Sequence, residues 1–279
     1  MSKHHPLVAR FAEARLALEL ASAPLITRGA AGTDAIVQLD IARRSRGRAK
    51  LEAFRLWLGH ADNRVEVQSV DRKLEQLVLL IHEPRRRFEL EVSRLAGLAP
   101  GTRVLREDAR RRWIERTTND RKRHFLCGMD EQHLFIAQLP ASAPTVRAAH
   151  DVLKDPRVTA AERSAPARTI RQGEWFFVAL TPSEARDIEA QIGRGQFIRR
   201  NVGIAEAARI RRIGRPHVAD EVFVAPGLRE RPGPALPRAY VRGAVRHPDH
   251  RTVFFHSWRL VVPNLEALEQ PVEGIAWVD

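Results

Sequence analysis

The sequence predicts an α+β protein, built mainly of antiparallel strands with a few short helices. Apolar and polar residues alternate over several short segments that are bounded by Gly, Pro, Asn or Ser, which is typical of antiparallel strands. Only a few segments have the period of about 3.6 residues that indicates a helix. With 44% hydrophobic and 29% charged residues, the composition is that of a folded globular chain.

The first hundred residues predict a helix followed by a run of antiparallel strands. Apolar residues recur at helical spacing from Leu7 to Leu18, and Pro6 suits the first turn of a helix. From Ala35 the period changes to two, which predicts strands over residues 37–41, 51–58, 65–70, 77–83 and 88–92. We expect Pro84–Arg87 to form the tip of a hairpin between the last two strands.

The middle of the chain predicts a boundary between two domains. Residues 106–116 and 145–154 have helical patterns, and residues 124–127 and 133–139 predict a pair of strands. Residues 156–167 contain Pro, Ser and Ala without a period, which indicates a linker or a long surface loop. We therefore expect an N-terminal domain over 1–155 and a C-terminal mixed α+β domain over 168–279, with one single domain as the alternative.

The clearest local signal lies in the C-terminal half. Thr181-Pro182-Ser183-Glu184 combines a capping box with Pro at the first helical position, and Gly193 marks the end of the helix. Residues 175–180, 240–246, 252–255 and 258–262 predict strands, whereas the Gly-, Arg- and Pro-rich run from the end of the helix to about Pro237 predicts irregular structure.

The chain is strongly basic, with 47 Lys and Arg against 34 Asp and Glu and a formal net charge of +13. Only five of the basic residues are lysines. The excess is spread along the chain, and the last 29 residues carry two basic and four acidic side chains. This distribution excludes a basic tail, so a face that binds anions must be assembled by folding.

Three basic triplets, each followed by an aromatic residue, predict a nucleic-acid-binding protein. They comprise Arg85, Arg86 and Arg87; Arg110, Arg111 and Arg112 with Trp113; and Arg121, Lys122 and Arg123 with Phe125. Arginine neutralises phosphate and a neighbouring ring can stack on an unpaired base. On a helix, Glu107 would pair with Arg111 and Asp108 with Arg112, which would neutralise part of that surface. The partner is therefore DNA or RNA, with an acidic protein as the alternative.

The alternative function is a metal-dependent hydrolase. If Arg246–Arg251 is a tight turn, His247 and His250 stand at its shoulders and can share a divalent metal, with His217 as a third ligand and Asp220 or Glu221 completing or orienting the site. An open fourth position would make such a site hydrolytic. Histidines in an ordinary surface turn are the competing interpretation.

Several classes of protein are disfavoured by the sequence. It contains no P-loop, dinucleotide-binding fingerprint, Gly-x-Ser-x-Gly, kinase set or His-Glu-x-x-His, and it does not decide whether the protein is an enzyme. The single Cys127 excludes an intramolecular disulfide and a zinc site of several thiolates. No segment has the apolar length of a membrane span or a signal-peptide core, so we expect a cytoplasmic protein without a membrane partner.

Three segments together carry a resemblance to other proteins: Cys127–Pro140, Arg171–Phe177 and Tyr240–His250. They are similar to segments of a group of uncharacterised bacterial proteins. The resemblance implies a bacterial or phage source and supplies neither an activity nor site residues.

Overall fold

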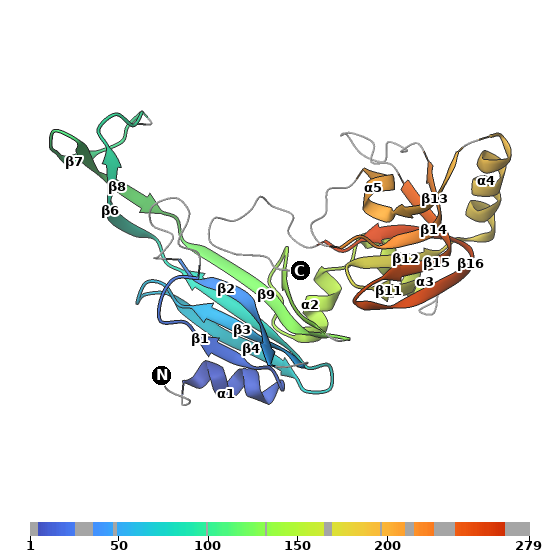
Figure 1. The fold of residues 1–279 in the computed structure, drawn as a ribbon, viewed down its shortest axis with the longest axis horizontal. Helices are drawn as coiled ribbons and strands as arrows, with labels where there is room; N and C mark the ends of the chain where they lie inside the picture. Colours follow the sequence, from blue (N-terminus) through green and yellow to red (C-terminus); the bar gives the residue numbers. More distant parts are fainter. Residues whose placement is uncertain are drawn as a thin grey trace. The chain divides into compact units, whose positions relative to one another are not determined.

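The computed structural model describes residues 5–25, 36–46, 49–98, 100–131, 133–164, 169–195, 197–209, 215–225 and 238–265. These residues fall into two compact units, the first with residues 5–129 and 134–149, the second with residues 130–133 and 150–265. Antiparallel sheets dominate both units, and the helices are few and short (Figure 1), which confirms the predicted fold class at this level. None of the helices in the described ranges is long and apolar enough to cross a membrane.

In the described part of the first unit, helix α1 and two sheets surround a common core. Its elements are α1 (Pro6–Glu13), β1 (Leu18–Leu20), β2 (Gln38–Arg46), β3 (Ala49–Trp57), β4 (Arg64–Asp71), β5 (Gln76–Glu83), β9 (Arg121–Asp130) and β10 (His133–Gln138). The sheet orders are β1-β3-β2 and β10-β9-β5-β4. Phe11 of α1 meets Phe54 of β3 edge to face at 5.4 Å, and both belong to the cluster that buries Leu79 and Phe125. The helix is shorter than predicted because Arg15 adopts φ +61°, and the chain continues as β1.

A third sheet extends two strands of the first unit. It consists of β6 (Arg86–Ser93), β8 (Arg111–Thr118) and β7 (Val104–Glu107), in the order β6-β8-β7. The pairs Glu83–Arg121, Arg86–Thr118 and Ser93–Arg111 share one register, so β5 with β6 and β9 with β8 form one antiparallel ribbon. Pro84 interrupts the hydrogen-bond ladder because it has no N–H. The chain does not reverse direction there, so the predicted hairpin at Pro84–Arg87 is wrong.

The predicted helix over residues 106–116 is also wrong. Arg111 forms an ion pair with Glu91 of the neighbouring strand at 2.8 Å, and Arg112 pairs with Glu107 at 3.0 Å. Charge pairing across strands thus replaces the pairing along a helix that the spacing of Glu107, Asp108, Arg111 and Arg112 had indicated.

The second unit contains a six-stranded antiparallel sheet in the order β11-β12-β16-β15-β14-β13. Its strands are β11 (Thr169–Gln172), β12 (Trp175–Ala179), β13 (Ile198–Gly203), β14 (Val218–Ala225), β15 (Arg238–His247) and β16 (His250–Pro263). Its helices are α3 (Pro156–Ser164), α4 (Pro182–Gly193) and α5 (Ile204–Ala208), and α2 (Val146–Val152) spans the point where the chain passes from the first unit to the second. Trp175, Phe177 and Phe255 lie in the main core of this unit.

Local signals were reliable for one helix of this unit and not for another. The capping box of α4 is confirmed, since Thr181 N–H donates to Glu184 Oε2 at 2.7 Å and Glu184 N–H donates to Thr181 Oγ1 at 3.3 Å. The predicted linker is largely helix α3, because Asp155 accepts the Arg157 N–H at 2.8 Å and Val158 is buried against Phe176.

The strand predictions of this unit need two further corrections. The predicted irregular run contains β13, α5 and β14, while residues 226–237 lie outside the described part. The two strands predicted over residues 252–262 are a single strand, β16.

Candidate metal centre

Three histidines of the second unit come together from a loop and one tight turn. His247 and His250 face each other at the β15–β16 turn, which contains only Pro248 and Asp249. His217 directly precedes β14, whose first residue Val218 pairs with Arg246 of β15. The strand pairing therefore carries His217 to the same end of β15 as His247.

The three imidazole rings form a compact group. The ring centroids of His217 and His247 are 4.2 Å apart, those of His247 and His250 4.8 Å, and those of His217 and His250 5.5 Å. One nitrogen of each ring lies within 4.8 Å of the corresponding nitrogens of the other two. His217 is 3% exposed and its ring meets Trp175 edge to face. The group is thus packed against the core from one side.

The other nitrogen of each ring faces an oxygen atom. His217 Nδ1 lies 3.6 Å from Glu174 Oε1, and His250 Nδ1 lies 3.9 Å from Glu131 Oε1. His247 Nε2 lies 3.1 Å from the carbonyl oxygen of Arg215. The His247 contact is a hydrogen bond of the kind that metal-binding histidines typically make with their second nitrogen, whereas the two carboxylates lie beyond hydrogen-bond distance of their nitrogens. The arrangement assigns Nε2 of His217, Nε2 of His250 and Nδ1 of His247 as ligand atoms.

The donor set fits a divalent transition metal, zinc in particular. Imidazole nitrogens bound to one tetrahedral zinc ion at about 2.05 Å lie about 3.4 Å apart. The widest spacing here is 4.8 Å, so binding must draw the rings together by about an ångström. The Asp249 N–H donates to His247 Nδ1 at 3.2 Å, which makes this nitrogen the unprotonated one of its ring, and a bound ion would replace that contact.

Gly173 leaves room beside the histidines. It opens the two-residue turn between β11 and β12 with φ +57°, and a Cβ atom there would lie 2.7 Å from His250 Nε2 and 3.4 Å from His217 Cε1. Both the backbone conformation and the space require glycine. The turn also supplies Glu174, and Figure 1 shows β11 and β12 within the same sheet as β15 and β16.

Asp220 does not join the three histidines, which corrects its assignment as a fourth ligand. Its carboxylate accepts the Ala244 N–H at 2.7 Å and pairs with Arg246 at 2.5 Å. The backbone hydrogen bond and the arginine lower the pKa of Asp220. The strand pairing is irregular at Asp220 and Gly243, and the missing side chain of Gly243 leaves space for the Asp220 carboxylate. A Cβ atom on Gly243 would lie 2.7 Å from Asp220 Oδ2.

The carboxylates at the centre, Glu131 and Glu174, were not predicted from the sequence. Both residues lie in turns, and neither stands at a sequence spacing from the histidines that would indicate a metal site. Glu131 reaches the site by accepting the N–H of Arg251, 120 residues further along the chain, at 2.8 Å.

The predicted nucleic-acid contacts of the first unit are partly exposed and partly interior. Arg85, Arg87, Arg110, Arg121 and Lys122 are exposed. Arg86 is hydrogen-bonded to Asn63, Arg111 and Arg112 are paired with glutamates, and Arg106 stacks over Trp113 at 4.5 Å.

Arg123 and Phe125 lie in the interior, which corrects their assignment as phosphate and base contacts. Arg123 is 6% exposed and is bound to Glu83 at 2.8 Å, while Phe125 is fully buried in the core. Strand β9 alternates, so Lys122 and Arg123 point to opposite sides.

The triplets do not form one patch. Thr117, opposite Arg87, lies five residues from Arg112 along β8, which corresponds to about 17 Å. A different basic group lies on one face of the four-stranded sheet, where Arg64, His82 and Lys122 stand directly opposite one another on β4, β5 and β9. His82 Nε2–H donates a hydrogen bond to Asp120 Oδ1 at 2.8 Å, and this bond lowers the pKa of the Asp120 carboxyl group.

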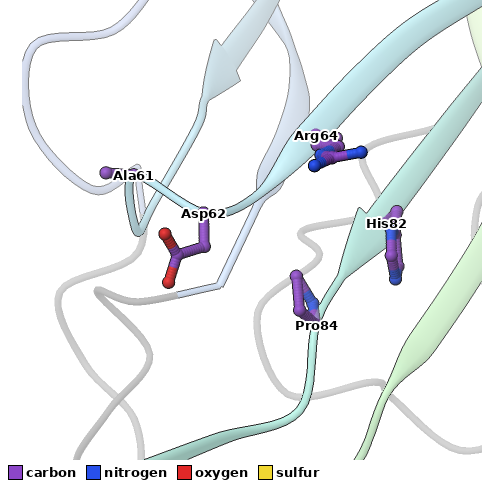
Figure 2. A pocket seen from close by; sticks show the side chains of 5 residues that line it. All are labelled: Ala61, Asp62, Arg64, His82 and Pro84. Atoms are coloured by element: carbon purple, nitrogen blue, oxygen red, sulfur yellow. The ribbon is translucent and has the colours of Figure 1, made fainter.

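A cavity of about 520 Å³ adjoins this row of basic side chains. It is lined by Ala61, Asp62, Arg64, His82 and Pro84 (Figure 2). Figure 2 shows Arg64 and His82 on neighbouring strands, with Asp62 on the loop before β4. The cavity is therefore lined by groups of both signs.

The chain matches no protein-family model, no curated protein and no solved structure.

Proposed function

We propose that the protein is a metal-dependent hydrolase whose divalent ion is held by His217, His247 and His250. The observation that carries the proposal is the convergence of three histidines from two segments, with one nitrogen of each ring within 4.8 Å of the other two. An oxygen of Glu174, Arg215 or Glu131 lies beside the second nitrogen of each ring, and that of Arg215 is at hydrogen-bond distance.

Three neutral ligands would leave the charge of a bound ion uncompensated and one coordination position open, so the ion would acidify water and polarise a carbonyl or phosphoryl oxygen. Glu174 is a positioning residue in this proposal, because its carboxylate lies beside His217 Nδ1, on the side of the ring away from the ligand nitrogen Nε2. The oxygen of water bonds to the electrophilic centre, and the proton of that water passes to the solvent. The bond to the leaving group then breaks, and its electron pair stays with the leaving group.

Metal analysis of the full chain, purified without a histidine tag, tests the proposal. We expect one zinc ion per chain, and loss of binding in isothermal titration with Zn²⁺ for His217→Ala, His247→Ala and His250→Ala. His256→Ala is the matched control, since His256 is an exposed histidine of β16 outside the group. Unchanged zinc binding by His247→Ala would overturn the proposal.

Zinc titration and hydrolysis of p-nitrophenyl acetate together test the role of Glu174. Glu174→Gln should raise the dissociation constant for Zn²⁺ by about 10–100-fold, because His217 loses its carboxylate partner, and should leave kcat of the zinc-saturated protein nearly unchanged. Unchanged zinc affinity in Glu174→Gln would exclude this residue as the partner that positions His217.

A second candidate function is nucleic-acid binding by the first unit, favoured by the row of Arg64, His82 and Lys122. Arg64 and Lys122 are exposed and lie on either side of His82 on one face of the sheet, so both can contact the phosphates of one bound strand. Arg85 and Arg121 are exposed near the same end of β5. An acidic protein partner offers carboxylates in place of phosphates.

Fluorescence anisotropy with labelled single-stranded DNA and RNA of mixed sequence tests this function over a range of salt concentrations. We expect the affinity to fall as salt rises, and Arg64→Ala and Lys122→Ala each to reduce the salt slope by about one. Arg112→Ala, which removes an arginine paired with Glu107, should leave the slope unchanged. Absent or salt-independent binding would contradict the proposal, and salt-sensitive binding of polyglutamate alone would favour the acidic protein partner.

A further inference from the structure

We infer that the protein forms a symmetric dimer through β6, which pairs in antiparallel orientation with β6 of a second copy. In the described part of the chain, β8 lies on one side of β6 and no strand lies on the other. An edge strand presents N–H and C=O groups to which another strand can be added. The inference concerns the first unit and does not depend on the metal centre.

The two edges of the three-stranded sheet differ. On β6, every residue from Arg86 to Ser93 pairs with β8 without a register shift. The other edge, β7, is the short strand Val104–Glu107, and its register shifts between Val104 and Arg106. Short strands and bulges protect an edge from further pairing, as do lysine and proline within the strand, and β6 has none of these features. Of these two edges, β6 is therefore the one open to a further strand.

The backbone of β6 alternates between β8 and the free edge. The Arg94 N–H donates to the carbonyl oxygen of Arg110 at 2.9 Å, in the same register as the pairs between β6 and β8. Hydrogen-bonded positions alternate along an antiparallel pair, so the even-numbered residues from 88 to 92 also bond to β8. The odd-numbered residues from 87 to 91 therefore direct their N–H and C=O groups to the free edge.

The charges along this edge are complementary to those of a second copy. Arg85 and Arg87 lie three residues and one residue before Phe88, whereas Glu89 and Glu91 lie one residue and three residues after it. An antiparallel pair centred on Phe88 places Arg87 opposite Glu89 of the second copy, and Arg85 opposite Glu91 of the second copy. Two-fold symmetry repeats both pairs, which gives four pairs of opposite charge. Such pairs stabilise antiparallel strands.

The charges favour this register over its neighbours. A pair centred on Arg87 would place Arg87 opposite its own copy, and a pair centred on Glu89 would place Glu89 opposite its own copy. Like charges directly opposite one another are destabilising. In the pair centred on Phe88, two aromatic rings meet at the symmetry axis instead, and aromatic pairs stabilise neighbouring strands.

The two glutamates remain able to bind an arginine of a second copy. Both are exposed, and each already holds an arginine of its own chain through one oxygen. Glu89 Oε1 lies 2.5 Å from Arg106 Nη2, and Glu91 Oε1 lies 2.8 Å from Arg111 Nη1. A carboxylate has two oxygens with about four acceptor positions, so each can accept from a further guanidinium group.

The start of β6 has room beside it. Strand β4 covers β5 only as far as His82, which pairs with Arg64. The cavity of Figure 2 is lined by Pro84, two residues further along the chain. The edge of the ribbon beyond β4 therefore borders open space.

Sedimentation equilibrium of the full chain tests the inference. We expect a dimer whose dissociation constant rises at least about tenfold in Arg87→Glu and in Glu89→Arg, because each change makes two of the four pairs repulsive. Arg110→Glu and Glu107→Arg make the same charge changes at exposed residues outside β6 and should leave the dissociation constant unchanged.

An equimolar mixture of Arg87→Glu and Glu89→Arg should recover the dimer. In a mixed pair, each new acidic side chain faces a new basic one, and the two unchanged residues face each other. This recovery distinguishes pairing across the symmetry axis from damage to the fold of either variant.

Oxidation of cysteine variants tests the register. In Phe88→Cys the two copies of the residue would form a non-hydrogen-bonded pair with Cα atoms about 4.5 Å apart, which suits a disulfide. In Leu90→Cys, the matched control, the two copies would lie four residues apart along the strands, or about 14 Å, which is too far. The natural Cys127 is buried and does not interfere. We expect a covalent dimer for Phe88→Cys alone.

Three results would overturn the inference. A chain that stays monomeric at every concentration would exclude the dimer. A dimer that both charge variants leave intact, or that the mixture does not restore, would exclude β6 as the contact. Cross-linking of Leu90→Cys in place of Phe88→Cys would exclude the register centred on Phe88.

Discussion

Substitution of Gly173 by alanine should separate metal binding from folding. The new methyl group would lie 2.7 Å from His250 Nε2, whereas ordinary contacts begin at about 3.4 Å, so the nitrogen must move by about 0.7 Å. Metal–nitrogen distances are held to within about 0.2 Å, and binding already requires the rings to come together, so a methyl group in the space beside this nitrogen weakens one of three ligands. We expect the dissociation constant for Zn²⁺ to rise by about 100-fold or more, since loss of even an outer partner costs about 10–100-fold.

The same substitution should have only a modest effect on stability. The positive φ of +57° costs an alanine about 1–2 kcal/mol in free energy of unfolding, while the histidine ring is the mobile end of a side chain and can yield to the methyl group. Gly195→Ala is the matched control, because Gly195 has φ +83° and a Cβ there would meet nothing within 4 Å.

Isothermal titration with Zn²⁺ and urea unfolding of the metal-free proteins provide the two readouts. Both variants should lose similar stability, and only Gly173→Ala should lose zinc affinity. Wild-type zinc affinity in Gly173→Ala would refute the assignment of His250 Nε2 as a ligand atom.

Three further predictions concern the first unit. Arg123→Met should lower the free energy of unfolding by about 3–5 kcal/mol in urea, because Glu83 stays buried and keeps only the Val37 N–H, 2.8 Å away. Complete burial raises the pKa of the Cys127 thiol, so 5,5′-dithiobis(2-nitrobenzoate) at pH 8 should label it only after unfolding. Burial lowers the pKa of His124 below its ordinary value of 6.5, so its contribution to stability is present above pH 6.5 and is lost as pH falls through the lower folded pKa. In urea unfolding between pH 7.5 and 5, His124→Gln should therefore show a smaller decline than the wild type.

Each of these predictions has a control or a result that contradicts it. The double variant Arg123→Met with Glu83→Gln should recover part of the lost stability, and no loss in the single variant would show that the ion pair is not needed for folding. Rapid labelling of native Cys127 would contradict its burial. An unchanged pH dependence in His124→Gln would show that this histidine does not titrate with unfolding.

The sequence was sufficient to predict those elements whose stabilising contacts join residues close together in the chain. Helix α4 depends on contacts within four residues of Thr181, and the histidine turn depends on a pairing of His247 with His250 across two residues. Strand β4 follows from alternation of apolar and polar residues, and β5 and β15 follow from short apolar runs. For such elements, the interacting atoms are neighbours in the chain.

Prediction failed where the cause is a contact between distant residues. The charges of residues 106–116 suit a helix as well as a strand, and pairing with β6 decides in favour of strands β7 and β8. Asp220 was misassigned because the bulge opposite Gly243 cannot be read from spacing. Glu131 could not be assigned to the site, since 120 residues separate it from its hydrogen-bond donor, Arg251.

The single register shared by β5–β6 and β9–β8 restricts how this part of the chain can change in length. Deleting one residue from β6 alone would turn every side chain beyond the deletion to the opposite face, and Glu91 would no longer meet Arg111. Only removal of equal numbers of residues from both strands preserves the pairing. Relatives with a longer or shorter ribbon should therefore differ by matched insertions or deletions in two segments that are far apart in sequence.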